Sequence, residues 1–517
     1  MTKRFSRVIG LFAPVLMVAS LAVAAKAGSN SATVFVRVSG ASPFARCHII
    51  LGDGEINSLN GEVEPWVAVN PADPNNLIGV WQQDRFQIIG ARGIVTGFSH
   101  DGGRSWSRNF PHFSRCAGGN AKNGGDYERA TDPRVAFSPN GIANQIALSL
   151  DLSDALEAVL ASRSTNGGSQ WSQPKVILAD TDPNVFDDEP TISADVNDSR
   201  FVYAVWDRVD ANFTPNLGPS WFARSTNGGN TWQPAKSIYD PGPDAQTIAN
   251  QIVVLPNGDL VNLFALLTNQ SNPTLAATMV GVIRSQDKGA TWSQPIIINT
   301  LQSVGITDVK TGEMVRTGDI IPDMAVDGRT GTLYVVWQDA RFSGDLRDGI
   351  ALSQSNDGGL TWSAPVQVNQ VPAVQAFTAS VDVANNGTIG INYYDFRKDN
   401  SDPNVLLTNY WQITSRKVNG PWHEVPLGGS FDLRTAPFDP VLGYFLGDYE
   451  GLAHANNSFV PFFAKTNSGK LANPTDIFTA LFGGLGDTGT NGHVEVNANP
   501  MPLVERLKAR RLSRQLR

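Results

Sequence analysis

The octapeptide SNDGGLTW (355–362) decides the fold, because close copies of it recur along the chain. The copies are SHDGGRSW (99–106), STNGGSQW (164–171), STNGGNTW (225–232) and SQDKGATW (285–292), with a weaker one in SRKVNGPW (415–422). Their tryptophans are separated by 65, 61, 60, 70 and 60 residues: Trp106, Trp171, Trp232, Trp292, Trp362 and Trp422. A near-constant step of this length is typical of a repeat architecture.

The residues between the octapeptides predict β-strands. Each unit opens with a short apolar run: EPWVAVN (64–70), DPRVAFS (132–138), EPTISAD (189–195), NQIVVLP (250–256), IPDMAVD (321–327), FTASVDV (377–383) and DYEGLAH (448–454). A second run follows in most units: LIGVWQQDR (77–85), FVYAVWDR (201–208), LYVVWQDAR (333–341) and IGINYYDFR (389–397). With one strand entering the octapeptide and one leaving it, each unit has four strands. Four strands in each of several successive units predict an all-β propeller with four-stranded antiparallel blades.

The octapeptide itself is expected to be a hairpin turn. Asp-Gly-Gly or Asn-Gly-Gly supplies the positive φ values that a tight turn needs, and the Asp or Asn side chain can bond backbone amides within it. The tryptophan is then expected to pack back on the blade and to fix the hairpin against a neighbour. These motifs are therefore predicted to be structural and not catalytic.

The pattern S-x-D-x-G-x-x-W resembles the Asp box of sialidases and their bacterial-neuraminidase-repeat (BNR) relatives. The resemblance covers roughly residues 60 to 465 and rests on five good copies. It implies a β-propeller of glycosidase type, although Asp boxes also occur in other glycosidases and in non-catalytic propellers.

The number of blades stays open between six, as in sialidases, and seven, which the seven opening strands favour. The last strand of the seventh unit is expected from HVEVN (493–497) or from the N-terminal TVFVRV (33–38). The expected organisation is a signal peptide (1–27), an N-terminal segment holding a possible closing strand (28–63), the propeller (64–497) and a basic tail (498–517).

The first residues are typical of an export signal. A basic start precedes an almost wholly apolar run (8–24) and the cleavage pattern Ala25-Lys26-Ala27. An uncleaved membrane anchor is the alternative, because the run is close to spanning length. In either case the body is expected outside the cytoplasm, secreted or periplasmic. In such a compartment Cys47 and Cys116, the only cysteines of the 517 residues, are expected to form one disulfide.

The net charge of −8 is unevenly distributed. Residues 1–27 hold four basic and no acidic residues, and residues 505–517 hold six basic and one acidic, so the rest carries 30 basic against 47 acidic. An acidic body argues against a nucleic-acid partner, whose binding needs a basic face. With 41% hydrophobic and 17% charged residues the chain is a well-cored globular protein, with no later stretch apolar enough to insert stably in a membrane.

Strand alternation predicts which face carries the chemistry. In a four-stranded antiparallel blade, the start of the first strand and the end of the second lie on one face, and the octapeptide turns lie on the other. The second strands end in Asp84-Arg85, Asp207-Arg208, Asp339 with Arg341, and Tyr394-Asp395-Phe396-Arg397. The first strands open with Glu64, Asp132, Asp188-Glu189, Asp319, Asp323 and Asp448-Tyr449-Glu450. These charges either form a ligand site or are internal ion pairs that hold the loops.

The resemblance to sialidases implies roles for these residues. Arginines would grip the sugar carboxylate through their planar forks, and the candidates are Arg85, Arg341 and Arg397. A tyrosine activated by a glutamate would attack the sugar, with Tyr449 or Tyr394 as nucleophile and Glu189 or Glu450 as base. Asp84 is the candidate acid. The substrate-binding candidates are Asp207, Arg208, Asp339 and Asp395.

The sequence departs from the sialidase pattern at one point. Sialidases usually carry a Phe/Tyr-Arg-Ile-Pro motif before the first Asp box, and the corresponding region here reads QQDRFQII (82–89). No zinc, Gly-x-Ser-x-Gly or phosphate-loop signature is present. No cofactor is expected, with calcium at DPNVFDDE (182–189) as an alternative to a metal-free acidic loop.

We therefore expect a secreted, exo-sialidase-like glycoside hydrolase acting on terminal sugars of glycans. A non-catalytic Asp-box propeller that binds glycans or proteins is the alternative from another functional class, and another glycosidase specificity is the third.

Overall fold

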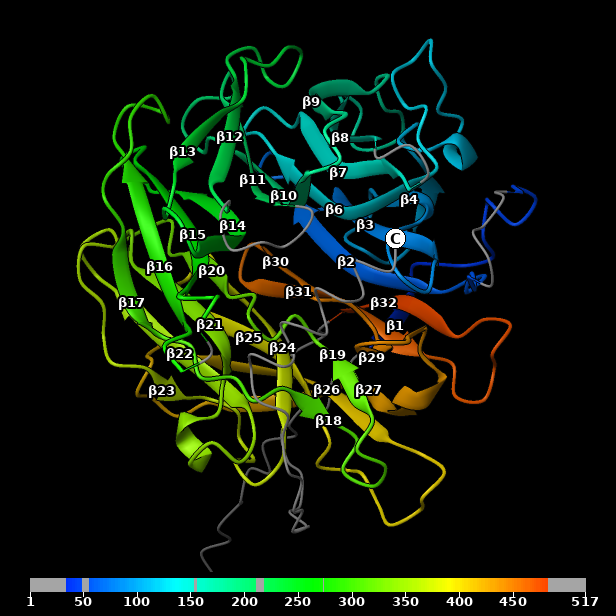
Figure 1. The fold of residues 1–517 in the computed structure, drawn as a ribbon, viewed down its shortest axis with the longest axis vertical. Helices are drawn as coiled ribbons and strands as arrows, with labels where there is room; N and C mark the ends of the chain where they lie inside the picture. The colour runs from blue at the N-terminus through cyan, green and yellow to red at the C-terminus, as the bar shows by residue number, and fades with distance from the viewer. Residues whose placement is uncertain (1–33, 49–54, 153–155, 211–217, 273, 482–517) are drawn as a thin grey trace, which may run out of the picture.

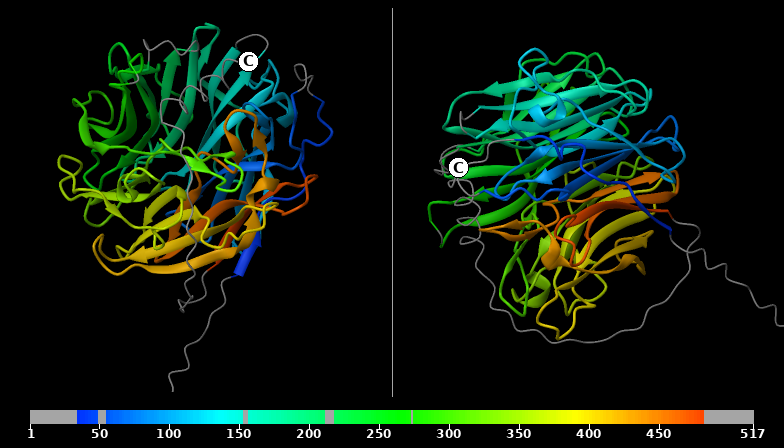
Figure 2. Two further views of the ribbon diagram at one scale, coloured as in Figure 1. Left: turned by 60° about the horizontal axis from the view of Figure 1, so that its bottom comes forward. Right: turned by 90° about the vertical axis from the view of Figure 1, so that its right-hand side faces the viewer.

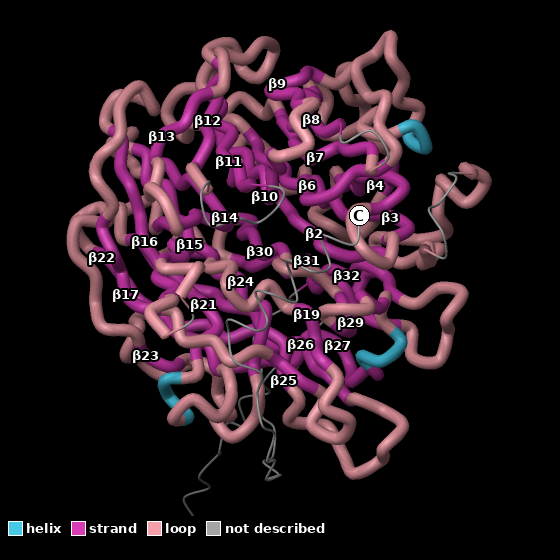
Figure 3. Tube along the Cα trace, viewed as in Figure 1, coloured by secondary structure: helices cyan, strands magenta, loops and turns pink. Residues whose placement is uncertain are grey.

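The computed structural model describes residues 34–48, 55–152, 156–210, 218–272 and 274–481. The expected signal peptide, the strand 493–497 and the basic tail lie outside the described residues. The described chain is almost entirely β, which confirms the all-β prediction. The helical elements in it are three 3₁₀ turns (Figure 3): η1 (Arg115–Ala117), η2 (Arg341–Ser343) and η3 (Leu433–Thr435). No helix of the described chain is long and apolar enough to span a membrane.

Most strands belong to four-stranded antiparallel groups, here called sheets 1 to 7 in chain order, as predicted for the blades. Sheet 1 holds β2 (Glu62–Val69), β3 (Leu77–Arg85), β4 (Ala91–Ser99) and β5 (Ser107–Asn109); sheet 2 holds β6 (Arg129–Phe137), β7 (Ala143–Asp151), β8 (Leu156–Ser164) and β9 (Lys175–Asp180). Sheet 3 holds β10 (Val185–Ala194), β11 (Val202–Asp210), β12 (Ser220–Ser225) and β13 (Lys236–Tyr239); sheet 4 holds β14 (Ala245–Val254), β15 (Leu260–Thr268), β16 (Ala277–Ser285) and β17 (Ile296–Thr300).

The remaining three groups follow the same order. Sheet 5 holds β20 (Asp323–Val326), β21 (Leu333–Asp339), β22 (Gly349–Ser355) and β23 (Val366–Gln367); sheet 6 holds β24 (Ala376–Val383), β25 (Ile389–Asp395), β26 (Leu407–Ser415) and β27 (His423–Asp432). Sheet 7 holds β30 (Gly451–Ala455), β31 (Ser458–Thr466), β32 (Thr475–Leu481) and, as its fourth strand, the N-terminal β1 (Val34–Arg37). One backbone bridge, between Ala91 and Ala130, links sheets 1 and 2.

The first strands of the sheets lie at the centre of the molecule (Figure 1). Each contacts the first strand of the next sheet in the order β2, β6, β10, β14, β20, β24 and β30, and β30 contacts β2 in turn. The apolar clusters lie between adjacent sheets. Ile78 and Val80 of sheet 1, for example, share a cluster with Ala147 and Leu160 of sheet 2.

A small additional sheet lies outside this repeat, and we call it the cap. It consists of β18 (Ile306–Thr307), β19 (Met314–Arg316), β28 (Phe438–Asp439) and β29 (Gly443–Phe445). β19 and β29 pair in parallel although they are far apart in the chain, and they lie side by side in Figure 1. No sequence signal predicted this sheet.

The octapeptides form the turns that follow the third strand of a sheet. In SNDGGLTW, Ser355 ends β22 and its hydroxyl donates to Asp357 Oδ1 at 2.8 Å, while the Thr361 amide donates to the same oxygen at 2.9 Å. The Gly359 amide donates to Ser355 Oγ at 2.8 Å, with φ of 90°, which favours glycine. Hydrogen bonds from Thr361 lower the pKa of Asp357 to about 2.

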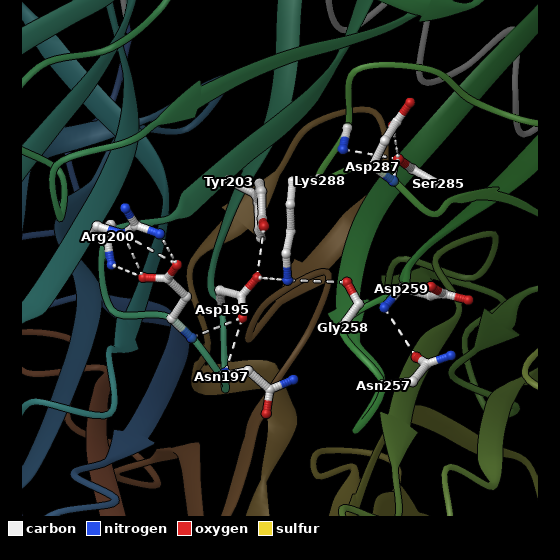
Figure 4. A network of polar contacts seen from close by, with 12 residues as sticks. Asp195, Asn197, Arg200, Tyr203, Asn257, Gly258, Asp259, Ser285, Asp287 and Lys288 are labelled. Atoms are coloured by element: carbon white, nitrogen blue, oxygen red, sulfur yellow. Dashed lines mark hydrogen bonds and ion pairs between the residues drawn. The ribbon is translucent and has the colours of Figure 1, made fainter.

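The octapeptide turn of one sheet also contacts the sheet before it (Figure 4). Lys288, in the turn that follows β16 of sheet 4, reaches Asp195 of sheet 3 at 2.7 Å, and Asp195 also accepts from the Tyr203 hydroxyl at 2.8 Å. The tryptophans pack in the same direction: the Trp292 ring lies 5.6 Å from that of Phe222, and Trp106 lies 5.6 Å from Phe462.

The N-terminal segment is tied to sheet 1. Cys47 and Cys116 form a disulfide with a Cα–Cα distance of 5.5 Å. The Ser42 hydroxyl donates to Asp84 Oδ2 at 2.6 Å, and the Asn60 amide donates to Asp84 Oδ1 at 2.8 Å. Two views from other sides show this blue N-terminal segment running beside the orange strands of sheet 7 (Figure 2).

Trp362→Ala is expected to lower the free energy of unfolding by about 2 kcal/mol, because its side chain is half-buried against the cluster shared by sheets 4 and 5. A fully buried tryptophan would cost roughly 3–5 kcal/mol. Denaturant unfolding measures the change, with Leu471→Ala, at a site 79% exposed, as the control. Equal stability of both variants and the parent would contradict the proposed packing.

Candidate functional site

The first strands carry a repeated bulge near their start. Their pairing with the second strand shifts register at this point in five sheets, and a non-glycine residue there has a left-handed backbone. These residues are Glu64 (φ 54°), Asp132 (φ 52°), Glu189 (φ 51°), Ala249 (φ 62°) and Thr378 (φ 47°). Such a conformation costs about 1–3 kcal/mol, and residues that adopt it occur preferentially at functional sites. A bulge also re-aims side chains.

Five acidic residues meet near the starts of the first strands, and we call them the central carboxylate cluster. Glu64, Asp132, Asp188, Glu189 and Asp448 come from sheets 1, 2 and 3 and from the start of sheet 7, and all are more than nine-tenths buried. Burial is the main cause that raises the pKa of Glu189 well above its usual range, and the other four carboxylates raise it further. Burial and Asp188 raise the pKa of Asp132 to about 6.

Hydrogen bonds hold this cluster in place. Gln82 Nε2 donates to Glu64 and, at 2.8 Å, to Thr131 Oγ1, whose hydroxyl donates to Asp132 Oδ1 at 3.0 Å. The Asp448 amide donates to Glu64 Oε1 at 3.4 Å. Burial raises the pKa of Glu64 as well, which favours the protonated form of this carboxyl group.

Two arginines face the cluster. The Arg134 guanidinium lies 3.2 Å from the centre of the Tyr449 ring and 4.1 Å from that of Trp66, and within the described chain its buried Nη1 has no hydrogen-bond partner. Arg316 donates from Nε to the Asp448 carboxylate at 3.0 and 3.2 Å. Neither arginine was among the sequence candidates. Arg134 stands in a quoted strand, DPRVAFS, directly after the register shift between β6 and β7.

A narrow cavity lies beside the cluster. It encloses about 20 Å³, enough for about one water molecule, and its lining includes Arg134, Glu189, Asp323, Asp448 and Tyr449. Asp323 accepts from Gln251 Nε2 at 2.9 Å and from the Val381 amide at 2.8 Å, and burial raises its pKa to about 6.

The structure does not assemble the expected arginine triad. Arg341 donates to both oxygens of Asp339, at 2.7 and 2.8 Å, and Arg397 is paired with Asp395 and Glu424. Arg85 donates to Gln82 Oε1 and to backbone carbonyls, and its guanidinium lies 4.9 Å from the Phe445 ring. Arg341 and Arg397 are each bound by an aspartate two residues earlier in the chain, whereas the partners of Arg85 are an amide oxygen and backbone carbonyls.

The other paired candidates are also structural. Arg208 is bound to Asp187 and Asp180, and Asp395 and Asp339 each accept from an indole, Trp411 and Trp337, at 2.7 Å. Asp207 lies nearer the centre: its Oδ2 accepts from the Ala249 amide at 2.7 Å, and burial together with Asp188 raises its pKa to about 7. Asp84, the candidate acid, instead accepts the Ser42 and Asn60 bonds of the N-terminal segment.

Of the two candidate nucleophiles, Tyr394 forms the expected pair but lies in the core. Its hydroxyl donates to Glu450 Oε1 at 2.7 Å, its ring packs 4.3 Å from that of Tyr410, and it has no exposed surface. Tyr449 lies at the cavity, with its hydroxyl 3.4 Å from the Pro133 carbonyl oxygen. Of the candidate bases, Glu189 and not Glu450 belongs to the central cluster.

No group of three or more His, Cys, Asp or Glu side chains in the described part of the chain has a geometry that could hold a metal ion. The acidic stretch 182–189 instead contributes Asp187 and Asp188 to separate contacts: Asp187 pairs with Arg208, and Asp188 is a neighbour of Asp132 and Asp207.

No family model matches the chain, and no curated protein matches it. Among solved structures, the chain resembles the Hadza microbial sialidase Hz136 at 15% identity, over 79% of this chain and 74% of that one, with a TM-score of 0.45. It also resembles the α-L-arabinanase of Penicillium chrysogenum (12% identity, 87% and 98% covered, TM-score 0.47). A third is the NanB sialidase of Streptococcus pneumoniae (13% identity, 69% and 68% covered, TM-score 0.42).

Arg397→Lys is expected to lower the free energy of unfolding by about 1–2 kcal/mol, because lysine keeps the charge but cannot bind Asp395 and Glu424 through a fork. The matched control is Arg200→Lys, since Arg200 is 73% exposed and its pair with Asp198 should contribute little. Thermal unfolding compares the two. An unchanged melting temperature for Arg397→Lys would argue against a structural ion pair.

Stability is expected to fall as the pH rises from about 4 to about 7. Asp132, with a pKa of about 6 in the folded protein, binds its proton more tightly there than in the unfolded chain, where its pKa is about 4. Its stabilising contribution is thus complete below about pH 4 and is lost as the pH rises through about 6. Asp132→Asn should flatten this decline in a series of melting temperatures. The exposed Asp345→Asn, at a φ of 63° that suits asparagine, should not.

Proposed function

We propose that the protein is an exported glycoside hydrolase that removes terminal sugars from glycans. The observation that carries this proposal is the central carboxylate cluster, in which buried carboxyl groups with raised pKa lie next to a carboxylate balanced by arginine. Cleavage of a glycosidic bond needs one carboxylic acid that holds its proton near neutral pH and a second carboxylate that is ionised.

Two residues suit these roles. Glu189 is the proposed proton donor, because burial and four neighbouring carboxylates raise its pKa and it lines the cavity. Asp448 is the proposed ionised partner, because the Arg316 guanidinium donates to both of its oxygens. Tyr449 and Arg134, stacked beside them, would contact the sugar.

The proposed scaffold is a closed propeller of seven blades. Its support is the cyclic order of contacts between the first strands, together with the pairing of β1 with β32, which gives the last sheet its fourth strand. In such a ring, the strand starts converge on one axis. The octapeptides are proposed to act as Asp boxes, which here join successive blades.

Sialidase specificity is the less supported form of this proposal. Gripping a sugar carboxylate needs arginines free to donate to it, and Arg341 and Arg397 are already paired with carboxylates of the protein. The second candidate function, a non-catalytic propeller that binds glycans or proteins, is favoured by one observation: the cavity beside the cluster encloses only about 20 Å³.

Hydrolysis of chromogenic glycosides tests the proposal. The purified protein is expected to cleave at least one member of a panel of neutral pentosides and hexosides and a sialoside between about pH 4 and 7. Glu189→Gln should lower kcat at least 100-fold, because the amide has no acidic proton to give. Glu313→Gln, in the cap, is the control. Glycan binding with no hydrolysis of any substrate would favour the non-catalytic alternative.

A further inference from the structure

The central axis is covered at the end where the carboxylates lie. Phe445 of the cap is 1% exposed, with the guanidinium groups of Arg316 and Arg85 at 4.3 and 4.9 Å from its ring. The carbonyl of Leu446, the next residue, accepts a hydrogen bond from the Glu64 amide at 3.0 Å. The Thr378 hydroxyl donates to the Thr317 carbonyl at 3.1 Å. The segments around the cap are thus bonded to the starts of β2 and β24.

At the opposite end of the axis, the described residues leave a cavity open to the surface. This cavity of about 630 Å³ lies between the far ends of the first strands, on the face that carries the octapeptide turns. Its wall combines aliphatic residues, among them Val69, Val253, Val326 and Val383, with polar and charged ones. This volume suits a small ligand or the end of a chain-like one.

The wide cavity is adjacent to the narrow one. Trp66, Gln251 and Asp323 line both, so the two cavities are neighbours along the axis with these residues at the junction. Asp323 and Gln251 are half-buried, whereas the central carboxylates behind them are buried.

Apart from Asp323 at the junction, charged groups of the wide cavity are paired with one another. His454 Nδ1 lies 2.7 Å from Asp382 Oδ2, and Arg329 Nη2 donates to Asp327 Oδ2 at 2.9 Å. The wall therefore adds little net charge, and its His454 and Arg329 are already paired with carboxylates of the protein. Neither cation is left to bind an anionic ligand, so a neutral ligand suits this wall better.

We propose that the wide cavity on the octapeptide face is the binding site for the terminal part of a neutral glycan and is the route to the central carboxylates. The glycan as ligand rests on the proposed function, but the route does not. Aliphatic walls pack against the C–H surfaces of a sugar, and the amide and carboxylate of Gln251 and Asp323 bind its hydroxyls at the junction. This entrance is opposite to the face on which strand alternation placed the chemistry.

A single reporter cysteine tests the route. Both native cysteines are in the disulfide, so Ala379→Cys, in the lining of the narrow cavity, introduces the one free thiol. The rate of its modification by 2-aminoethyl methanethiosulfonate is measured in the full-length folded protein. We expect modification, and an at least tenfold lower rate when Ala453→Trp fills the wide mouth. Asn385→Trp, an exposed residue of the same mouth, serves if Ala453→Trp fails to fold.

Two control substitutions complete the test. Leu471→Trp, remote and 79% exposed, should leave the rate unchanged, and Phe445→Ala, which loosens the cap, should change it less than twofold. An unreactive Ala379→Cys, a rate insensitive to both mouth variants, or a tenfold gain with Phe445→Ala would overturn the proposed route.

The ligand class is tested with the same reporter. Maltotriose, cellotriose or arabinotriose is expected to slow the modification at millimolar concentration, and 3′-sialyllactose is not. Protection by the sialoside alone, or by none of these sugars, would overturn the neutral-glycan assignment. Protection without hydrolysis would overturn the proposed enzymatic function and leave the binding site standing.

Discussion

The packing of each sheet on the sheet before it is the interaction on which the rest of the structure depends. A four-stranded sheet whose two faces are both apolar has to be covered on both sides, and here each sheet is covered by its two neighbours. Ile78 of sheet 1 and Leu160 of sheet 2 share one such cluster. The octapeptide turns fix these contacts at the edge, as Lys288 does when it reaches Asp195.

This arrangement places polar side chains at the centre of the molecule. When sheets are set side by side around an axis, the starts of their first strands crowd together, and whatever side chains open those strands become neighbours. In sheets 1, 2 and 3 the openings are Glu-Pro or Asp-Pro, so carboxylates meet away from water. Their burial costs free energy unless hydrogen bonds, arginines or protons compensate, and all three occur around Glu64, Asp132 and Asp448.

The repeated features of the fold could be predicted from the sequence. The strand 77–85 matches β3 at both ends, and the octapeptides are turns after a third strand, because the same local signal recurs six times. The cap could not be predicted, since β19 pairs with a strand more than a hundred residues away and no repeat marks it. The tryptophans of the octapeptides are half-buried and not buried, because each lies at a sheet edge.

Only part of the site could be predicted from the sequence, and the reasons are again physical. Strand alternation placed Glu189 and Tyr449 on one face, and both line the narrow cavity, since this depends only on strand direction. It could not show that Arg341 and Arg397 bind the aspartates beside them, because the partner of an arginine depends on how far its side chain extends. It also missed Arg134, which follows the bulge at Asp132 and does not open its strand.

The pairing of β1 with β32 sets the order in which the chain can be completed. Ser39, just after β1, bonds Asp476 across 437 residues, one of the longest separations in the protein. Contacts of such separation form late, because a long loop must close first. Nearly the whole chain must therefore leave the ribosome before sheet 7 can acquire its outer strand. Until then the edge of β32 lacks this partner, and the start of the chain, tethered near sheet 1 through Ser42 and Cys47, is held close to where it will be needed.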